Sequence, residues 1–462
     1  YSIGAGGVTM SWWNERKSER GAPVAWFLAH GTVKMQAHGP WEVVPRRWWP
    51  ALVNEWRQAA ARGARTLLVG VANRGGQLLS AFLSHADCEV AALCDVNRTT
   101  LAKANQRVEG KAATYEDFRK LIDRDDLDAV VIATPDHWHA IQTIAACDAG
   151  KDVYVEKPLA ITVREGRRMV EAARRNDRVV QVGTHRRSSE LYAQLADITT
   201  AGGIGKITVG RAYRLSNMYP GGIGRAEPSA APEDLNWDLW LGPRPQRPFQ
   251  ESIAPYKFRW WHLYSSQMGN WGVHYLDAIR WLSGELAPAS ICAMGGRFAV
   301  DDDRTVPDTA EAVFEFASGR LAIFGQYEAS GNPAMPRGEI EIRGTQGTAY
   351  IDTRTFEIVP ERGGQFQDRA PRMKPMKVEA NEVNHDLTCR HARNFLDCMR
   401  SREKPRADVE IGHRSTTFSL LANISLATKM RLEWDAEKEA ITNSKEANDL
   451  LDYEYRKPWK HA

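Results

Sequence analysis

The sequence lacks several features that would assign a function at once. Its 462 residues contain six cysteines, and none of these forms a CxxC pair. The twelve histidines form no HExxH sequence and no cluster with cysteine. Because zinc sites depend on such spacings, the sequence predicts no metal site. Several cysteines stand on apolar runs, where we expect reduced thiols in the core.

Long apolar runs and an excess of charge of one sign are also missing. No stretch approaches the roughly 20 apolar residues that a membrane-spanning helix needs. The formal net charge is only +3, from 61 Lys and Arg against 58 Asp and Glu. Proteins that bind nucleic acid or membrane surfaces through charge usually carry a basic excess. We therefore expect a small-molecule ligand, with no nucleic-acid and no membrane partner.

The first 64 residues have the least regular pattern of the chain. We predict an extension of unknown role over residues 1–64, with an amphipathic helix at 51–62. Arg46 and Arg47 resemble the pair of a twin-arginine export signal. However, charged residues follow where the apolar segment of such a signal should lie. On this pattern alone we favour a cytoplasmic location.

From Thr66 onward, apolar strand patterns alternate with helical ones. Such alternation predicts a parallel sheet covered on both faces, which is the doubly wound α/β (Rossmann) fold. We assign this domain to residues 65–186. Its predicted strands are 66–71, 89–95, 111–115, 127–135, 152–158 and 178–183.

The first strand ends in the glycine-rich turn GVANRGG, residues 70–76. It reads GxAxxG rather than GxGxxG, and the alanine is tolerable if its φ angle is negative. Such a turn brings backbone N–H groups at a helix N-terminus to a pyrophosphate. The residues predicted to bind the cofactor here are Gly70, Ala72, Asn73, Arg74 and Gly75.

Asp95 ends the second predicted strand, 25 residues after Gly70. An acid in this position accepts hydrogen bonds from the adenosine ribose and repels a 2′-phosphate. Arg98 is close enough to soften that preference. We therefore predict NAD as the cofactor, with NADP possible.

The remaining candidates follow the later strands at the same edge of the sheet, where ligands of this fold bind. The strand VYV at 153–155 ends in Glu156, Lys157 and Pro158, and Pro158 stops the strand. To the cofactor we further assign Thr134, Pro135, His139, Glu156 and Lys157. To the substrate we assign His185 and Arg187.

The second half of the chain, residues 187–462, is rich in strand patterns joined by short connections. This predicts an α+β domain with an open, largely antiparallel sheet. The free face of such a sheet is commonly a subunit interface, so we expect a homo-oligomer, a dimer or tetramer. Predicted helices lie at about 187–200, 271–283, 388–401 and 408–430, and we expect the last two to pack back on the first domain.

The stretch 213–261 is a long loop rich in proline, glycine and aromatic residues. Long ordered loops are usually functional, and flat aromatic faces suit a sugar ring. Alternatively, Trp237 and Trp240 only pin the loop to the body of the protein. The sequence leaves both interpretations open.

The stretch ATPDHWHAIQTIAACDAGKDVYVEKP, residues 133–158, resembles the Gfo/Idh/MocA family of glucose-fructose oxidoreductase and inositol dehydrogenase. The stretches 236–243, 258–282 and 391–415 resemble a branch of exported bacterial oxidoreductases, which leaves export possible. The resemblance implies NAD(H) or NADP(H), and a pyranose, polyol or inositol substrate. It also implies that Lys157 lies near the hydride-transfer centre.

The resemblance further implies an Asp followed four residues later by a His in the substrate domain. Here the pair is Asn270 and His274, with Trp271 between them, and we assign all three to the substrate. An amide cannot carry charge or take a proton, so a mechanism that needs the family's carboxylate is in doubt.

Oxidation of a secondary alcohol needs a base for the hydroxyl proton. The reference pKa of lysine, about 10.4, must be lowered by burial or a nearby cation before it can be that base. The reference pKa of histidine, about 6.5, needs a smaller shift for this role. Our hypothesis assigns the proton to His274, with Lys157 polarising the oxygen and Glu156 fixing the nicotinamide or Lys157. A cis bond before Pro158 would hold Lys157 in place.

Two other functions fit the same residues. A glycosidase could use bound NAD to oxidise a sugar carbon transiently and cleave by elimination. A non-catalytic, NAD-bound sensor or scaffold is mildly favoured by Asn270.

Overall fold

The computed structural model describes residues 63–380 and 386–460, and four short strands within the first 62 residues. These strands form a small sheet in the order β1-β2-β3-β4. Their bounds are β1 Ser2–Gly4, β2 Gly7–Thr9, β3 Val33–Met35 and β4 Glu42–Val44. The helix predicted at 51–62 lies outside the described residues, and the role of residues 1–64 stays a prediction.

The first large sheet is the predicted parallel Rossmann sheet, with the strand order β10-β9-β8-β5-β6-β7. Numbered along the chain, this is the order 6-5-4-1-2-3 that typifies dinucleotide-binding domains. The strands are β5 Ala64–Val69, β6 Cys88–Cys94, β7 Ala113–Tyr115, β8 Ala129–Ile132, β9 Asp152–Val155 and β10 Val180–Val182.

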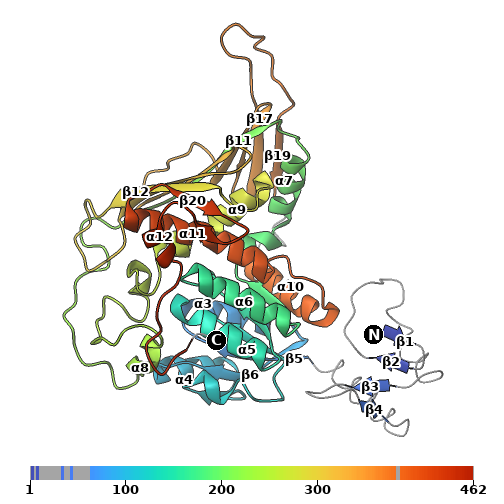
Figure 1. Ribbon diagram of the computed structural model, residues 1–462, viewed down its shortest axis with the longest axis vertical. Coiled ribbons are helices and arrows are strands. Elements are labelled where there is room, and N and C mark those ends of the chain that lie inside the picture. The colour runs from blue at the N-terminus through green and yellow to red at the C-terminus, as the bar shows by residue number, and fades with distance from the viewer. Residues whose placement is uncertain are drawn as a thin grey trace. The chain divides into compact units, whose positions relative to one another are not determined.

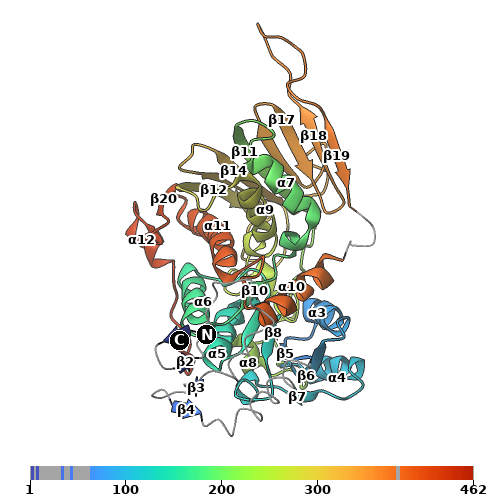
Figure 2. The same cartoon turned by 90° about the vertical axis from the view of Figure 1, so that its right-hand side faces the viewer.

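Helices pack against this sheet, as Figures 1 and 2 show. Every residue of β8 and β9 is buried, which explains why these strands read as apolar runs rather than alternating ones. The sequence pattern Thr162-x-x-Glu165 is typical of a capping box, and one is present at the start of α6, where the two side chains accept each other's backbone N–H groups. The helices are α3 Asn73–Leu83, α4 Arg98–Arg107, α5 His139–Asp148 and α6 Val163–Arg175.

The second sheet is open and has eleven strands, of which β11 and β14 pair in parallel and the other described pairs are antiparallel. It is the largely antiparallel sheet predicted for the second half. Its strands are β11 Ile207–Asn217, β12 Ser290–Gly296, β13 Thr309–Glu315, β14 Leu321–Tyr327, β15 Ala329–Ser330, β16 Ile340–Gly344, β17 Gly347–Ile351, β18 Thr355–Pro360, β19 Met376–Glu379, β20 Leu432–Asp435 and β21 Ala440–Ile441.

One face of this sheet carries the core of the second domain. Along β13, Ala310, Ala312 and Phe314 are buried, whereas Val313 between them is exposed. Helices α7 Glu190–Thr200, α9 Val273–Ser283 and α11 Val409–Thr428 cover the buried face (Figure 2).

The C-terminal helices connect the two sheets. α10 Leu387–Ser401 packs on α3, and α11 packs on α6. The Thr416 hydroxyl of α11 accepts the Leu159 N–H at 3.1 Å, directly after the Lys157–Pro158 turn. The remaining short helices are η2 Phe118–Lys120, η3 Asp136–Trp138, η4 His185–Ser188, α8 Trp237–Leu241, η5 Lys257–Trp260, η6 Met268–Gly272 and α12 Lys445–Asp449.

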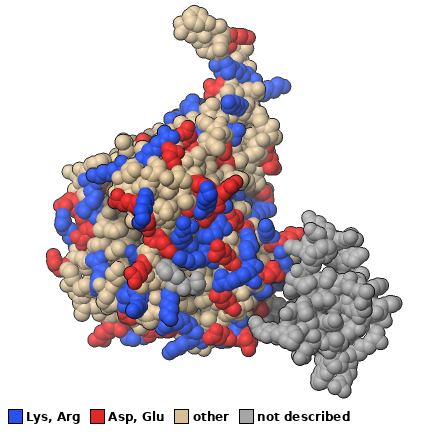
Figure 3. Space-filling model, viewed as in Figure 1, with Lys and Arg blue, Asp and Glu red and all other residues tan. Residues whose placement is uncertain are grey.

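Several structural findings bear on ligands. Within the described residues, no helix is long and apolar enough to cross a membrane, and no three His, Cys, Asp or Glu side chains gather as metal ligands. Cys94, Cys147 and Cys398 are buried thiols. Basic and acidic side chains are interspersed over the face shown in Figure 3, in keeping with the small net charge.

Candidate active site

The turn after β5 has the backbone shape that a dinucleotide site needs. Gly70 has a φ of +79°, which favours glycine. At Gly75, a Cβ atom would lie 1.8 Å from the carbonyl oxygen of Gly70, so only glycine fits between α3 and its strand. Ala72 has a φ of −80°, which meets the condition set for its methyl group. The GxAxxG sequence therefore forms a tight strand-to-helix turn.

Asp95 is fixed at the carboxyl end of β6. Its carboxylate accepts the backbone N–H groups of Val71 and Asn97, each at 2.9 Å. Burial raises its pKa, and these two hydrogen bonds act in the opposite direction. Arg98, by contrast, donates its guanidinium to the carbonyl of Glu233 at 2.5 Å. One N–H of the Arg98 guanidinium is therefore used within the protein.

A pocket runs along this edge of the sheet, from Asp95 to the N-terminus of α3. Its walls at the Asp95 end also include Glu116 and Asp117, so three carboxylates gather there. The predicted cofactor residues that line it are Gly70, Ala72, Asn73, Arg74, Asp95, Thr134 and Pro135. Of the other predicted cofactor residues, Gly75 shapes the turn, and His139, Glu156 and Lys157 stand beside the pocket lining.

The long loop of the second domain forms the opposite wall of this pocket, through Trp240, Phe258 and Arg259. The Trp240 carbonyl accepts the ring N–H groups of His137 and Trp138 at 2.9 and 3.0 Å. Trp240 therefore pins the loop, and it lines the cofactor pocket; its contact with a sugar ring stays a prediction. Trp237 stacks on Trp240 with ring centroids 4.7 Å apart and donates its indole N–H to the Arg247 carbonyl at 2.8 Å, so its contacts pin the loop.

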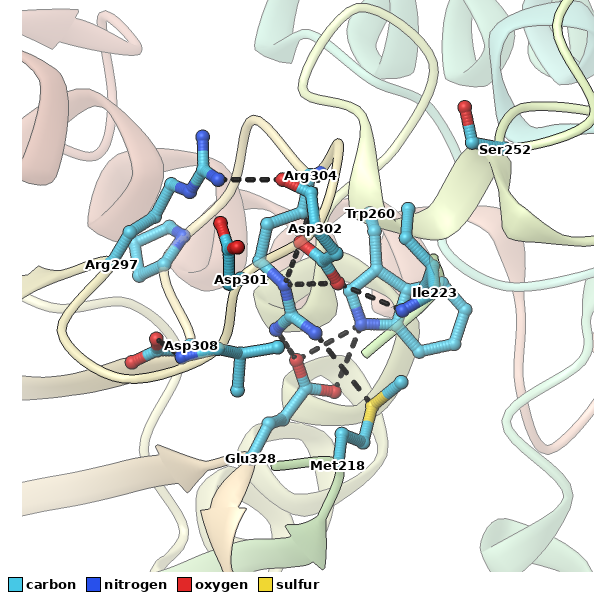
Figure 4. Close-up of polar contacts among 12 residues, drawn as sticks. Met218, Ile223, Ser252, Trp260, Arg297, Asp301, Asp302, Arg304, Asp308 and Glu328 are labelled. Carbon is cyan, nitrogen blue, oxygen red and sulfur yellow. Dashed lines mark hydrogen bonds and ion pairs between the residues drawn. The ribbon is translucent and has the colours of Figure 1, made fainter. Parts of the chain in front are cut away.

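A buried ion cluster anchors the other end of the loop (Figure 4). Arg304 is fully buried and donates to Asp302 at 2.9 Å and to Glu328 at 2.5 Å. Glu328 also accepts the indole N–H of Trp260, and Asp302 accepts the backbone N–H of Ile223. The wall of the pocket is thus held at both ends by buried hydrogen bonds.

Glu156 joins the glycine-rich turn to the fifth strand of the Rossmann sheet. Its carboxylate accepts the Arg74 guanidinium at 2.8 Å and the Lys157 backbone N–H at 3.3 Å. Burial alone would raise its pKa, but the cations of Arg74 and Lys157 outweigh burial and lower it. Glu156 is therefore an ionised anchor of the turn.

Lys157 is held by the residue that departs from the family pattern. Its Nζ donates both to the backbone carbonyl and to the side-chain Oδ1 of Asn270, each at 2.8 Å. The Lys157–Pro158 bond is cis, as predicted. His139 lies between the carbonyls of Pro158 and Thr134, at 2.8 and 3.0 Å. The His139 ring thus links the Lys157–Pro158 turn to the end of β8.

The surroundings of Lys157 disfavour its charge. Burial lowers the pKa of Lys157 to about 8; the Glu156 carboxylate opposes this shift, and the Arg259 cation adds to it. The amide of Asn270 adds no compensating negative charge. A fraction of the amine is therefore neutral close to physiological pH.

His274 and His185 meet beside Lys157, with ring centroids 5.1 Å apart. Burial, followed by the charge of Lys157, lowers the pKa of His274 well below its ordinary value. Burial also lowers the pKa of His185. Within the described residues, the Nδ1 atoms of both rings are buried without a hydrogen-bond partner. Two neutral rings with unused polar atoms suit the hydroxyl groups of a ligand.

Arg187 does not serve the predicted substrate role. Its guanidinium is buried in an ion pair with Asp277 at 2.9 Å and packs over Trp281. Because these contacts use the guanidinium, it joins η4 to α9 instead. Trp271 lies near the predicted site, with its ring centroid 6.5 Å from that of His274. The guanidinium carbon of Arg214 lies over this ring, 3.8 Å from its centroid.

Arg214 and Arg259 were not among the residues predicted for the site. Arg214 is one residue of a strand pattern and looks like any partly exposed arginine. Arg259 lies in the stretch 258–282, whose resemblance to the family was a usable signal. Both become visible only when β11 and η5 are placed beside the Rossmann edge.

The residues at this edge fit a nicotinamide dinucleotide. Because Gly75 has no Cβ, α3 packs close to the strand before it, and the N-terminus of this helix is where a pyrophosphate binds in this fold. The Nη2 atom of Arg74 is buried there without a partner in the described structure. Asp95 stands ready for the ribose at the other end of the pocket.

Comparison with known proteins agrees with this geometry. Residues 64–184 match the family model described as an oxidoreductase family, NAD-binding Rossmann fold. Residues 240–350 match a GFO/IDH/MocA C-terminal domain, and residues 343–461 match an oxidoreductase-family C-terminal alpha/beta domain.

Two curated relatives are dehydrogenases. Inositol 2-dehydrogenase of Salmonella typhimurium is 36% identical over 133 residues, which are 28% of this chain and 40% of that protein. Levoglucosan dehydrogenase of Pseudarthrobacter phenanthrenivorans is 29% identical over 283 residues, 55% of this chain and 65% of that protein. The chain thus matches less than two thirds of either relative's length.

Among solved structures, a levoglucosan dehydrogenase in complex with NADH and levoglucosan shares the fold, with a TM-score of 0.62 at 19% identity. The match covers 80% of this chain and 99% of that one. Three matched domains in the expected order, on this fold, show that the chain belongs to the Gfo/Idh/MocA family of NAD-binding oxidoreductases.

Proposed function

We propose that this protein is an NAD-dependent dehydrogenase that oxidises a secondary alcohol of a sugar, polyol or inositol-type substrate. The observation that carries the proposal is the position of the Lys157 amine, held by Asn270 between the cofactor pocket and the two histidines. The names of the two curated relatives, inositol and levoglucosan dehydrogenase, support this substrate class.

Lys157 is the better base of the two candidates, which reverses the hypothesis drawn from the sequence. A neutral amine has two N–H groups, and the two oxygens of Asn270 accept both. Its lone pair is then free to take the proton of a substrate hydroxyl. A pKa of about 8 suits this task, whereas that of His274 is well below its ordinary value.

His274 and His185 then orient the substrate through hydrogen bonds to its hydroxyl groups. Glu156 and Arg74 keep the glycine-rich turn and the lysine in register. NAD, when bound, supplies the acceptor for the hydride of the same carbon. Proton and hydride thus leave one CH–OH group, which becomes a carbonyl.

The Asp95 end of the pocket supports NAD over NADP. Asp95 and Glu116 line this end of the pocket without a cation partner in the described structure and would repel a 2′-phosphate, whereas Asp117 is ion-paired with Arg119. Juxtaposed like charges cost several kcal/mol.

The two alternatives have less support. Glycoside cleavage needs an acid for the leaving group, and the Glu156 carboxylate beside the lysine is ion-paired with Arg74. The sensor interpretation rested on Asn270, which now has a role in holding the base.

We also propose a homo-oligomer formed through the outer face of the large sheet. Met294 on β12 is 76% exposed there, and Val313 and Leu321 on the neighbouring strands are also exposed. Light scattering of the wild type and of a Met294→Glu variant tests this, with a loss of oligomer expected in the variant.

The test of the function is a screen of sugars, polyols and glycosides for NADH formation, with NAD and NADP in parallel. Formation of NADH from a polyol, lost in Lys157→Ala with NAD binding intact, supports the proposal. Cleavage of an aryl glycoside without added NAD, or tight NAD binding without any turnover, would contradict it.

A further inference from the structure

An arginine without an acidic partner lies at the substrate end of the site. Most arginines around the catalytic lysine are neutralised: Arg74 by Glu156, Arg186 by Glu339 and Arg187 by Asp277. The Arg214 guanidinium makes no hydrogen bond or ion pair within the described ranges 63–380 and 386–460, and it lies over the ring of Trp271.

The position of Arg214 in β11 directs it toward the site. Side chains alternate along a strand, and Gly210 and Ala212, on the same face as Arg214, are buried. Gly210 adjoins Ile279 of α9, the helix that also carries His274. Arg214 thus belongs to the face that covers the catalytic helix, rather than to the outer face with Tyr213.

Stacking leaves the binding edge of Arg214 unused. The guanidinium carbon lies 3.8 Å from the centre of the Trp271 ring, so a face of the group is in contact. The N–H donors lie in the plane of the guanidinium, at its rim, and can still bind both oxygens of a carboxylate. Trp271 therefore fixes the orientation of an anion receptor without neutralising it.

Two acidic residues act on Lys157, Glu156 and Asp136, and neither carboxylate is free to meet a ligand. Glu156 is paired with Arg74, and Asp136 is buried and accepts the hydroxyl of Ser265. Position 270, where the family resemblance implies a carboxylate, is an amide. Arg259 adds positive charge, although it lines the cofactor pocket and we assign it to that side.

We propose that the substrate is a polyhydroxy acid, whose carboxylate binds the free edge of Arg214 while a hydroxyl several carbons away lies at Lys157 and His274. This inference rests on the proposed dehydrogenase function and deepens it. Trp271 connects the two ends of this ligand, because its ring carries Arg214 and lies 6.5 Å from the ring of His274.

The first test compares matched pairs that differ by one carboxylate: D-gluconate with D-glucitol, D-galactonate with galactitol, and D-glucuronate with D-glucose. We expect NADH formation with a higher kcat/KM for the acid of at least one pair. In Arg214→Gln, the KM for that acid should rise ~10- to ~100-fold with little change in kcat, since a hydrogen-bonded charge is lost. The neutral partner should be unaffected.

Two variants sharpen this test. Arg354→Gln removes one exposed arginine from the turn between β17 and β18 and should leave both substrates unchanged. Asn270→Asp adds a negative charge to the site and should weaken binding of the acid more than binding of its neutral partner. Equal kinetics for acid and neutral compounds, or an Arg214→Gln variant with unchanged KM for the acid, would overturn the proposal.

A binding measurement separates this inference from the function on which it rests. Calorimetric titration of NADH-loaded protein with each acid should show binding that Arg214→Gln loses. If the acids bound in this way but were not oxidised, the polyhydroxy-acid ligand would stand and the proposed dehydrogenase function would be rejected. If neutral polyols were oxidised equally by the wild type and by Arg214→Gln, the dehydrogenase function would stand and the polyhydroxy-acid ligand would be rejected. If the protein preferred D-glucose 6-phosphate to every acid, the claim that Arg214 binds a carboxylate would be rejected.

Discussion

The cofactor pocket and the substrate site share one edge of the Rossmann sheet but are built in different ways. The pocket depends on the backbone of one local turn, Gly70–Gly75, and on a carboxylate held by nearby N–H groups. The substrate site depends on side chains from distant segments, such as Lys157 and Asn270, which are 113 residues apart. Backbone shape therefore decides cofactor binding, and charge balance decides the chemistry.

The largest expected effect is on the chemistry of the substrate site. Lys157→Ala removes the proposed base, and kcat/KM should fall about 10²- to 10⁴-fold, as expected for loss of general base catalysis. NAD affinity, measured by fluorescence quenching, should change little, because the pocket lining excludes Lys157. A variant that lost both in parallel would show that the two regions are not separable.

A comparable effect, on stability, is expected at the buried ion cluster that anchors the long loop 213–261. Arg304→Met leaves Asp302 and Glu328 buried without their cation, and the free energy of unfolding should fall by about 3–5 kcal/mol. Urea denaturation measures it. Arg297→Met is the matched control, because it loses one hydrogen bond to the Asp302 carbonyl and should cost only about 1 kcal/mol. Equal losses in both variants would contradict the anchor.

The cofactor pocket can be tested through its backbone. Gly75→Ala forces the new Cβ against the Gly70 carbonyl, and the strain, about 1–3 kcal/mol, should weaken NAD binding. At the neighbouring Gly76, a Cβ would meet the end of the Arg107 side chain at 3.1 Å, which can move. Gly76→Ala should therefore bind NAD nearly normally. If both alanines bound it equally, the tight turn would not be what holds the cofactor.

A smaller effect is expected at the acidic end of the pocket. Asp95→Ala removes a carboxylate that would repel a 2′-phosphate, so the preference for NAD over NADP should fall about tenfold, equivalent to about 1.4 kcal/mol. The ratio of kcat/KM values for the two cofactors measures it. An unchanged ratio would show that the strand-end acid does not select the cofactor.

The same contrast explains what the sequence could reveal. The Rossmann strands, the glycine turn, Asp95 and the capping box at Thr162 are local patterns, so residue order suffices to find them. The Arg187–Asp277 ion pair joins residues 90 positions apart, and Arg187 was therefore misassigned to the substrate. Likewise, no local pattern shows that Asn270 holds Lys157 rather than a substrate hydroxyl.

The central claim, that the neutral Lys157 amine held by Asn270 is the base, is tested most directly by the pH dependence of kcat/KM for alcohol oxidation. Burial lowers the pKa of Lys157 to about 8, and the active form is the deprotonated one. The rate should therefore rise as the pH increases and level off above about 8. In Asn270→Asp, the added carboxylate should move this midpoint upward by about one unit or more. A rate that falls above pH 8, or a midpoint unmoved in Asn270→Asp, would contradict the account and favour His274 as the base.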